Sequence, residues 1–305
     1  MSSTRSTRAT REERLRKAQA KIAVQRAAER RRRRLLLASV SVVVVLAVFL
    51  TLVLVKVAGG GSKTSGGAPA SGLSAAATAQ VVETTTHVPD SVLNAIGRGT
   101  TSNPPSSISG ASALTSDGKP EVVYMGYEWC PYCAAQRWAL VVALSRFGTF
   151  SGLGLTQSAS DDVYASTRTF TFANVKYSSP YLAFTAVEMQ DANRNPMQTP
   201  TAEQQHLLAV YDEPPYVSAN AAGGIPFVDL GGKYVINGSS YSPQVLAGLS
   251  WSQIAAALSD PNSAVAKGVN GSANVLTAAL CNLTGQQPSS VCSSKAVTDA
   301  KGALK

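Results

Sequence analysis

Two cysteines in a C-P-Y-C motif follow directly on an apolar segment, and this arrangement limits the possible folds more than any other feature. Residues 121–127 are almost continuously apolar, which is typical of a strand buried on both faces. Cys130 and Cys133 follow, with Pro131 between them. Proline favours the first position of a helix, because its fixed φ suits the helix and its missing N–H needs no partner. The sequence therefore predicts that a strand passes into a helix at Cys130.

A cysteine at the N-cap of a helix is favoured as a thiolate. The N-cap side chain accepts a hydrogen bond from a backbone N–H, and the helix dipole favours negative charge at this end. Reactive cysteines in such settings have pKa values of about 3.5–7.5, against about 8.5 for a free cysteine. We therefore assign Cys130 as the nucleophile and Cys133 as the thiol that resolves a mixed disulfide. Glu128 would raise the pKa of Cys130, and Arg137 is expected to offset it.

The positions of the other possible metal ligands argue against a zinc site. Structural zinc usually needs a second close pair of Cys or His residues. The other two cysteines, Cys281 and Cys292, are separated by ten residues, and the histidines, His87 and His206, are isolated. We therefore predict no metal site and no cofactor.

The basic residues of the chain are concentrated at its N-terminus. Thirteen Lys or Arg and three Glu fall within residues 1–34, so the rest of the chain is close to neutral although the whole carries +9. Residues 35–55 are an uncharged apolar run, long enough to cross roughly 30 Å of hydrocarbon as a helix. We predict a basic cytoplasmic tail over 1–34 and a transmembrane helix over 35–57.

Five consecutive arginines, residues 30–34, precede the apolar run. The positive-inside rule then places the N-terminus in the cytoplasm and everything after the span outside, as a single-pass protein of the cell membrane. A cleaved signal peptide is the alternative, but its apolar region would be about 7–15 residues long. The arginines are explained by topology and by attraction to anionic lipids, so we expect no nucleic-acid partner.

The remaining chain divides into a tether and one domain. Residues 58–80 are rich in Gly, Ser and Ala and are expected to form a flexible linker. Residues 81–305 are then the extracytoplasmic domain, with an insert at about 178–224. Within it we predict a helix over 88–96, a strand over 167–177, a helix over 199–211, a hairpin around Gly231-Gly232, and a helix that a capping box opens at Ser250.

This order of strand, CPYC helix, strand, insert, hairpin and closing helix is thioredoxin-like. Residues 129–133 resemble the active-site segment of the thioredoxin superfamily, and Ile225-Pro226 resembles its cis-proline before a hairpin. Residues 126–140 (GYEWCPYCAAQRWAL), 145–148 (SRFG) and 273–274 (AN) more specifically resemble a prokaryotic thioredoxin-like group, the domain-of-unknown-function family 929. We extend this match over about residues 85–295.

The resemblance implies an α/β fold, with a thioredoxin-like sheet flanked by helices and a helical insertion. It also implies that Trp129, Tyr132, Ile225 and Pro226 form the substrate-binding surface beside the cysteines. In the superfamily this proline lies against the CxxC, and the residue before it pairs with an extended substrate strand. The alternative for Pro226 is an ordinary trans proline that begins an edge strand.

Cys281 and Cys292 form a second pair near the C-terminus. A disulfide between them would close a loop of roughly a dozen residues and contribute about 3 kcal/mol, and an extracytoplasmic location permits it. The alternative is a second redox pair that relays electrons to or from Cys130 and Cys133.

Three functions are consistent with these features. The first is a membrane-anchored thiol–disulfide oxidoreductase whose partners are exported proteins and a separate redox protein. The second is a non-catalytic binding or assembly module in which the CxxC is a stable disulfide. The third is delivery of a soft metal ion such as Cu(I) through the dithiol.

Overall fold

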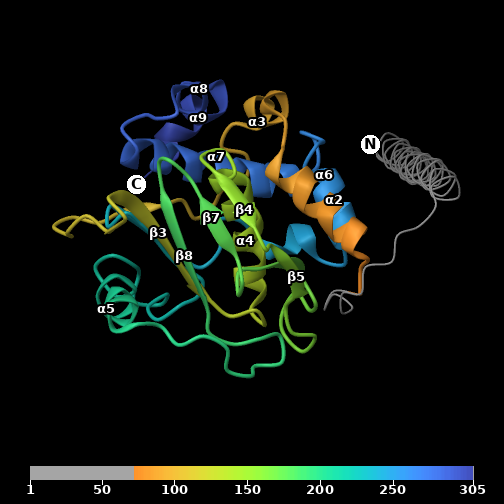
Figure 1. The fold of residues 1–305 in the computed structure, drawn as a ribbon, viewed down its shortest axis with the longest axis horizontal. Coiled ribbons are helices and arrows are strands. Elements are labelled where there is room, and N and C mark those ends of the chain that lie inside the picture. Colours follow the sequence, from red (N-terminus) through yellow and green to blue (C-terminus); the bar gives the residue numbers. More distant parts are fainter. Residues whose placement is uncertain (1–71, 305) are drawn as a thin grey trace, which may run out of the picture. The chain divides into compact units, whose positions relative to one another are not determined.

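The computed structural model describes residues 72–304 (Figure 1). The predicted basic tail, the predicted transmembrane helix and most of the predicted tether lie outside the described residues. Within residues 72–304, no helix is both long and apolar enough to cross a membrane.

The last part of the predicted tether is helical. Helix α2 runs over Ala75–Thr86, so the prediction of a flexible linker up to residue 80 is wrong for its final residues. Ser74 begins the helix as its N-cap and accepts a hydrogen bond from the N–H of Ala77. Val81 and Thr85 are buried, which fixes the helix on the domain. An alanine-rich run that looks like linker in the sequence is therefore stabilised by its cap and its packing.

A mixed sheet forms the centre of the domain. Its strands follow the order β1-β10-β9-β3-β2, and β8 also pairs with β3. The bounds are β1 (Ser106–Ser107), β2 (Thr115–Ser116), β3 (Lys119–Gly126), β8 (Ala183–Glu188), β9 (Phe227–Leu230) and β10 (Tyr234–Asn237). Strand β8 is parallel to β3, and β9 and β2 are antiparallel to it. The apolar run after residue 120 is thus a strand, as the sequence predicted, and it pairs with β2, β8 and β9.

The two faces of β3 belong to two separate hydrophobic cores. Val122 and Tyr124 pack into the larger core, which includes helices α4 (Pro131–Leu144) and α7 (Ala264–Leu283). Val123 and Met125 pack into the smaller core, which includes helix α5 (Ala202–Tyr211). Because successive strand residues point to opposite faces, helices cover both faces of the sheet (Figure 1). This arrangement explains why β3 is continuously apolar.

The strand predicted over 167–177 does not join this sheet. That segment forms β6 (Arg168–Thr171) and the start of β7 (Lys176–Ser178), which pair with β5 (Gly154–Gln157) and β4 (Thr149–Ser151) in two separate two-stranded sheets. The parallel neighbour of β3 is β8, which lies within the segment 178–224 that we predicted to be a helical insert. The Thr- and Phe-rich composition of 167–177 identified a strand but not its partner.

Helices α4 and α7 pack against each other at the centre of the larger core. Every residue of α4 except Tyr132 is buried. In α7, all residues from Val265 to Cys281 are buried except Lys267. Because α4 is apolar all round, it must be covered on all sides. Helix α7 and the sheet together provide this cover.

The local signals around the hairpin and the helix starts are confirmed. Strands β9 and β10 are joined through Gly231 and Gly232, which have φ angles of 65° and 67°, a region that favours glycine. Thr201 opens α5 with a capping box, two residues later than predicted. Ser250 opens α6 (Trp251–Ala257) with the predicted capping box.

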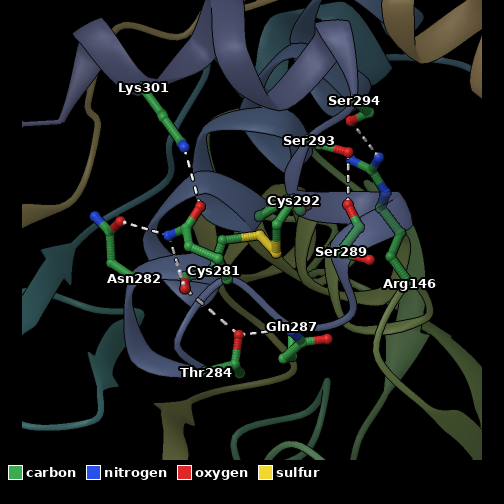
Figure 2. Close-up of a disulfide and its surroundings, with 12 residues drawn as sticks. Arg146, Cys281, Asn282, Thr284, Gln287, Ser289, Cys292, Ser293, Ser294 and Lys301 are labelled. Carbon is green, nitrogen blue, oxygen red and sulfur yellow. Dashed lines mark hydrogen bonds between the residues drawn. A yellow bond between two sulfur atoms is a disulfide. The ribbon is translucent and has the colours of Figure 1, made fainter.

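The C-terminal segment is joined to α7 by a disulfide between Cys281 and Cys292 (Figure 2). Gln286 donates its backbone N–H to the Cys281 carbonyl oxygen at 2.8 Å within the loop that this bond closes. The short helices around it are α3 (Asp90–Ile96), α8 (Ser289–Cys292) and α9 (Lys295–Ala300), and the 3₁₀ segments are η1 (Pro243–Leu246) and η2 (Lys301–Ala303).

Candidate active site

Cys130 is the N-cap of α4, directly after β3. Its φ and ψ angles are −80° and 124°, and its sulfur accepts a hydrogen bond from the N–H of Cys133 at 3.4 Å. The Cys130 side chain is almost covered, at 4% exposure, and Cys133 is fully buried. Both cysteines carry free thiols. The predicted start of the helix at Pro131 is therefore confirmed.

The two thiols have opposite pKa shifts. A hydrogen bond from the Cys133 side chain, opposed by burial, lowers the pKa of Cys130, with help from the backbone N–H groups of Cys133 and Tyr132. Burial raises the pKa of Cys133 well above its usual value, and the hydrogen bond to Cys130 adds to this. The site therefore makes the outer thiol, Cys130, more acidic than an ordinary cysteine and the inner thiol, Cys133, less acidic.

The loop before β9 lies against Cys130. The Ile225–Pro226 peptide bond is cis, and the carbonyl oxygen of Ile225 is 3.9 Å from the Cys130 sulfur. The Pro226 carbonyl oxygen accepts a hydrogen bond from the N–H of Gly238 at 2.8 Å, which ties the loop to the end of β10. The structure thus brings together residues that are 95 positions apart in the sequence.

Trp129 and Tyr132 lie on either side of Cys130 in the sequence and have different surroundings. The Trp129 ring stacks on Tyr127 with centroids 5.1 Å apart, and its Nε1 donates to Gln190 Oε1 at 2.7 Å. The guanidinium of Arg194 lies over the same ring, 5.3 Å from its centroid. Tyr132 is 40% exposed. Trp129 is therefore held in place by several contacts, whereas Tyr132 offers an open aromatic surface.

A buried ion pair lies behind the cysteines. Arg137, one turn after Cys133, pairs with Glu188 at the end of β8 through contacts of 2.8 Å and 2.6 Å. Both side chains are fully buried. Arg137 also donates to the Tyr127 carbonyl oxygen at 3.0 Å, so it joins α4 to the strand end that carries the motif. Its positive charge lowers the pKa values of both cysteines.

Tyr124 completes this buried group. The Arg137 guanidinium is 5.6 Å from the centre of the Tyr124 ring, and the Tyr124 hydroxyl has no hydrogen-bond partner within residues 72–304. Burial raises the pKa of Tyr124 well above its usual value, so the hydroxyl stays protonated. A Cβ at Gly126 would lie 3.0 Å from the Cys133 sulfur and would collide with the Tyr124 hydroxyl. Only glycine fits between the strand and the inner thiol.

No metal centre accompanies the dithiol in the part of the chain that the structure describes. Within residues 72–304, no group of three or more His, Cys, Asp or Glu side chains is arranged to hold a metal ion. His87 contacts Glu83 on the surface at 3.3 Å, and His206 is an exposed residue of α5. The absence of a metal site stays a prediction from the sequence spacing.

The sequence did not identify two parts of the site. One is the Arg137–Glu188 pair, although a charged residue within the apolar helix 131–144 was a signal that a buried partner exists. The other is a cavity of about 370 Å³ beside Ile225, lined in part by α5. No local pattern signals this cavity, because its walls come from four separate segments of the chain.

Comparison with known proteins identified a family. The model of a family described as "Domain of unknown function (DUF929)" matches residues 107–282, within the range of about 85–295 expected from the sequence. No curated protein and no solved structure matches the chain.

Proposed function

The chain belongs to the family of the domain of unknown function DUF929, and we propose that it is a membrane-anchored, extracytoplasmic thiol–disulfide oxidoreductase. The observation that carries the proposal is the asymmetry of its dithiol. The outer thiol, Cys130, has a lowered pKa, and the inner thiol, Cys133, has a raised pKa and no exposed surface. One thiol is thus prepared for attack and the other for resolution.

A thioredoxin-like fold is part of this proposal. It is supported by the C-P-Y-C motif at the start of α4, by the parallel pairing of β3 with β8, and by the antiparallel hairpin β9–β10 beside β3. The cis proline before β9, next to the Cys130 sulfur, supports it further. On this basis the segment between β8 and β9, with α5, is an insertion into the common core.

The proposed reaction is a two-step exchange. The Cys130 thiolate attacks one sulfur of a substrate disulfide and forms a mixed disulfide, and the other substrate sulfur leaves as a thiolate. Cys133 then loses its proton and attacks the Cys130 sulfur, which releases the second substrate thiolate. The substrate gains two electrons and the enzyme dithiol becomes a disulfide. The same steps in reverse oxidise a substrate dithiol.

Formation of the mixed disulfide at Cys130 favours the later attack by Cys133. When Cys130 is in a mixed disulfide, its negative charge is lost, and this charge is one cause of the raised pKa of Cys133. The Arg137 charge continues to favour the Cys133 thiolate. Resolution is therefore favoured only after the substrate has been bound covalently.

The proposed location rests on the sequence. The apolar run 35–55 after five arginines supports a membrane anchor with the domain outside the cytoplasm. The disulfide between Cys281 and Cys292 supports an oxidising compartment. Exported proteins with thiols or disulfides, and a separate redox protein, are the partners that such a location allows.

Trapping of mixed disulfides tests this function. The full-length Cys133→Ala variant keeps the attacking thiol but cannot resolve, so we expect it to accumulate mixed disulfides with exported proteins on non-reducing gels. The matched Cys130→Ala variant should trap far fewer. Equal trapping by the two variants would contradict the assigned roles, and trapping by neither would contradict the exchange function.

A further inference from the structure

A cavity of about 370 Å³ opens beside the dithiol, between the cis-proline loop and helix α5. This volume is within the range of roughly 300–1,000 Å³ that is typical of ligand sites, and it is sufficient for one long side chain. The cavity is lined by Tyr127, Met189, Gln205, Leu208, Ala209, Asp212, Glu213, Gly223 and Ile225.

Two of the lining residues are in direct contact with Cys130. The Tyr127 carbonyl oxygen accepts a hydrogen bond from the N–H of Cys130 at 3.3 Å. The Ile225 carbonyl oxygen is 3.9 Å from the Cys130 sulfur. A polypeptide whose cysteine reacts with Cys130 therefore places its neighbouring residues at the mouth of this cavity. Successive residues of an extended chain are about 3.3 Å apart, so the side chain that enters belongs to a residue close to the reacting cysteine.

The walls of the cavity combine apolar surface with two carboxylates. Tyr127, Met189, Leu208 and Ile225 supply the apolar part. Asp212 and Glu213, which follow the last residue of α5, supply the acidic part. A long aliphatic stem that ends in a cation fits such a surface, because the stem covers apolar walls while the charged end meets the carboxylates.

The two carboxylates have no cationic partner of their own. Within residues 72–304, neither Asp212 nor Glu213 forms an ion pair with Lys, Arg or His. Asp212 is buried and accepts a hydrogen bond from the side-chain amide of Asn237, which fixes its position. Glu213 is exposed. Asp212 is thus held in a fixed position, and Glu213 is accessible to a charged ligand.

We propose that this cavity binds a Lys or Arg side chain of the substrate polypeptide, within two residues of the cysteine that reacts with Cys130. The inference rests on the proposed exchange function and adds the substrate class to it. An apolar substrate side chain would cover the exposed Glu213 carboxylate without a compensating charge, and an acidic one would be repelled by it.

Exchange with charged peptides tests the proposal. The full-length chain, purified in detergent and reduced, is mixed with short peptides whose single cysteine is joined by a disulfide to neutral 2-mercaptoethanol. Each peptide carries a single Arg, Glu or norleucine, placed at one of the four positions within two residues of the cysteine. We expect kcat/KM for the best Arg peptide to exceed that for the matched Glu peptide by roughly tenfold at low salt, and we expect the ratio to fall as salt is added.

Charge variants of the cavity give a second readout. Glu213→Gln should reduce the preference for Arg, and Glu213→Lys should reverse it in favour of Glu peptides. The matched control is Glu203→Gln, because Glu203 is an exposed residue of α5, the helix that lines the cavity, but is not itself part of the cavity wall. This control should keep the wild-type preference.

The possible results distinguish failure of the cationic subsite from failure of the exchange function. Equal exchange of all peptides would overturn the cationic subsite and leave the exchange function standing. A preference for norleucine that Glu213→Lys leaves unchanged would show an apolar occupant instead and would also overturn the proposal. Absence of exchange with every peptide would contradict the proposed function itself, and this proposal with it.

Discussion

Replacement of Arg137 by methionine perturbs both the stability of the domain and the reactivity of Cys130. The Arg137 side chain is fully buried, pairs with Glu188 through contacts of 2.8 Å and 2.6 Å, and donates to the Tyr127 carbonyl oxygen at 3.0 Å. Methionine fills a similar volume but offers no hydrogen bonds. Among residues 72–304, the buried Glu188 carboxylate then keeps only the hydrogen bond from the N–H of Phe172, at 3.2 Å.

The expected loss of stability is large. Removal of one partner of a buried ion pair costs about 3–5 kcal/mol, because it leaves an uncompensated buried charge. Since domains are stable by about 5–15 kcal/mol, the variant should still fold at low temperature. The Arg137 charge also lowers the pKa of Cys130. We therefore expect the pKa of Cys130 to rise in the variant.

A double-mutant cycle in urea separates the pair from the other effects of each substitution. Glu188→Met alone should also be strongly destabilising, because it leaves the Arg137 charge unpaired. The double variant Arg137→Met, Glu188→Met should lose at least about 2 kcal/mol less than the sum of the two single losses, because it leaves no unpaired charge. The pKa of Cys130 is measured from the pH dependence of thiol labelling in the folded variants.

The control is Arg194→Met, because Arg194 is an exposed arginine that also lies near the motif. It should cost much less stability than Arg137→Met. Additive losses in the cycle, to within about 0.5 kcal/mol, would refute the coupling of Arg137 to Glu188. A pKa of Cys130 that is unchanged or lower in Arg137→Met would refute the electrostatic role of the arginine.

Three further predictions concern other parts of the domain. Replacement of Cys281 and Cys292 by serine should lower the free energy of unfolding by about 3 kcal/mol, measured in urea, with exchange activity per folded molecule unchanged; lost activity in the folded variant would support an electron relay. Burial raises the pKa of Asp229 to about 6, so between about pH 4 and pH 6 this carboxyl is protonated in the folded protein but ionised in the unfolded one, and the free energy of unfolding should fall by up to about 3 kcal/mol as pH rises through this range. Asp229→Asn should remove this fall from the pH dependence of urea unfolding, and an identical pH dependence in the two proteins would contradict the shift. Gly126→Ala should destabilise the domain by about 1–3 kcal/mol, because the new methyl group collides with the Tyr124 hydroxyl and crowds the Cys133 sulfur, and a neutral effect in thermal unfolding would contradict the close packing.

Local signals in the sequence predicted the parts of the structure that depend on neighbouring residues. Pro131 marked the start of a helix and Cys130 its N-cap, the Gly231-Gly232 pair marked a hairpin, and Ser250 marked a capping box. In each case the side chain or glycine acts on the backbone within a few residues of itself. Such features follow from composition and order alone.

The sequence could not reveal features that depend on distant partners. The segment 167–177 has the composition of a strand, but nothing in it specifies pairing with β4 and β5 rather than with β3. The apolar run at β8 was missed because it is short and lies between polar loops. The cavity needs α5 and the cis-proline loop to meet, and their contact arises only in the folded domain.

The reduction potential of the Cys130–Cys133 pair tests the central claim most directly. The full-length protein with Cys281 and Cys292 replaced by serine is equilibrated in glutathione redox buffers, and the fraction of reduced dithiol is measured by alkylation. Exchange catalysts have potentials of about −120 to −270 mV, whereas structural disulfides usually lie below about −300 mV. The asymmetric dithiol predicts a value in the first range. A potential below about −300 mV would contradict the account and indicate a CxxC disulfide that only stabilises the fold.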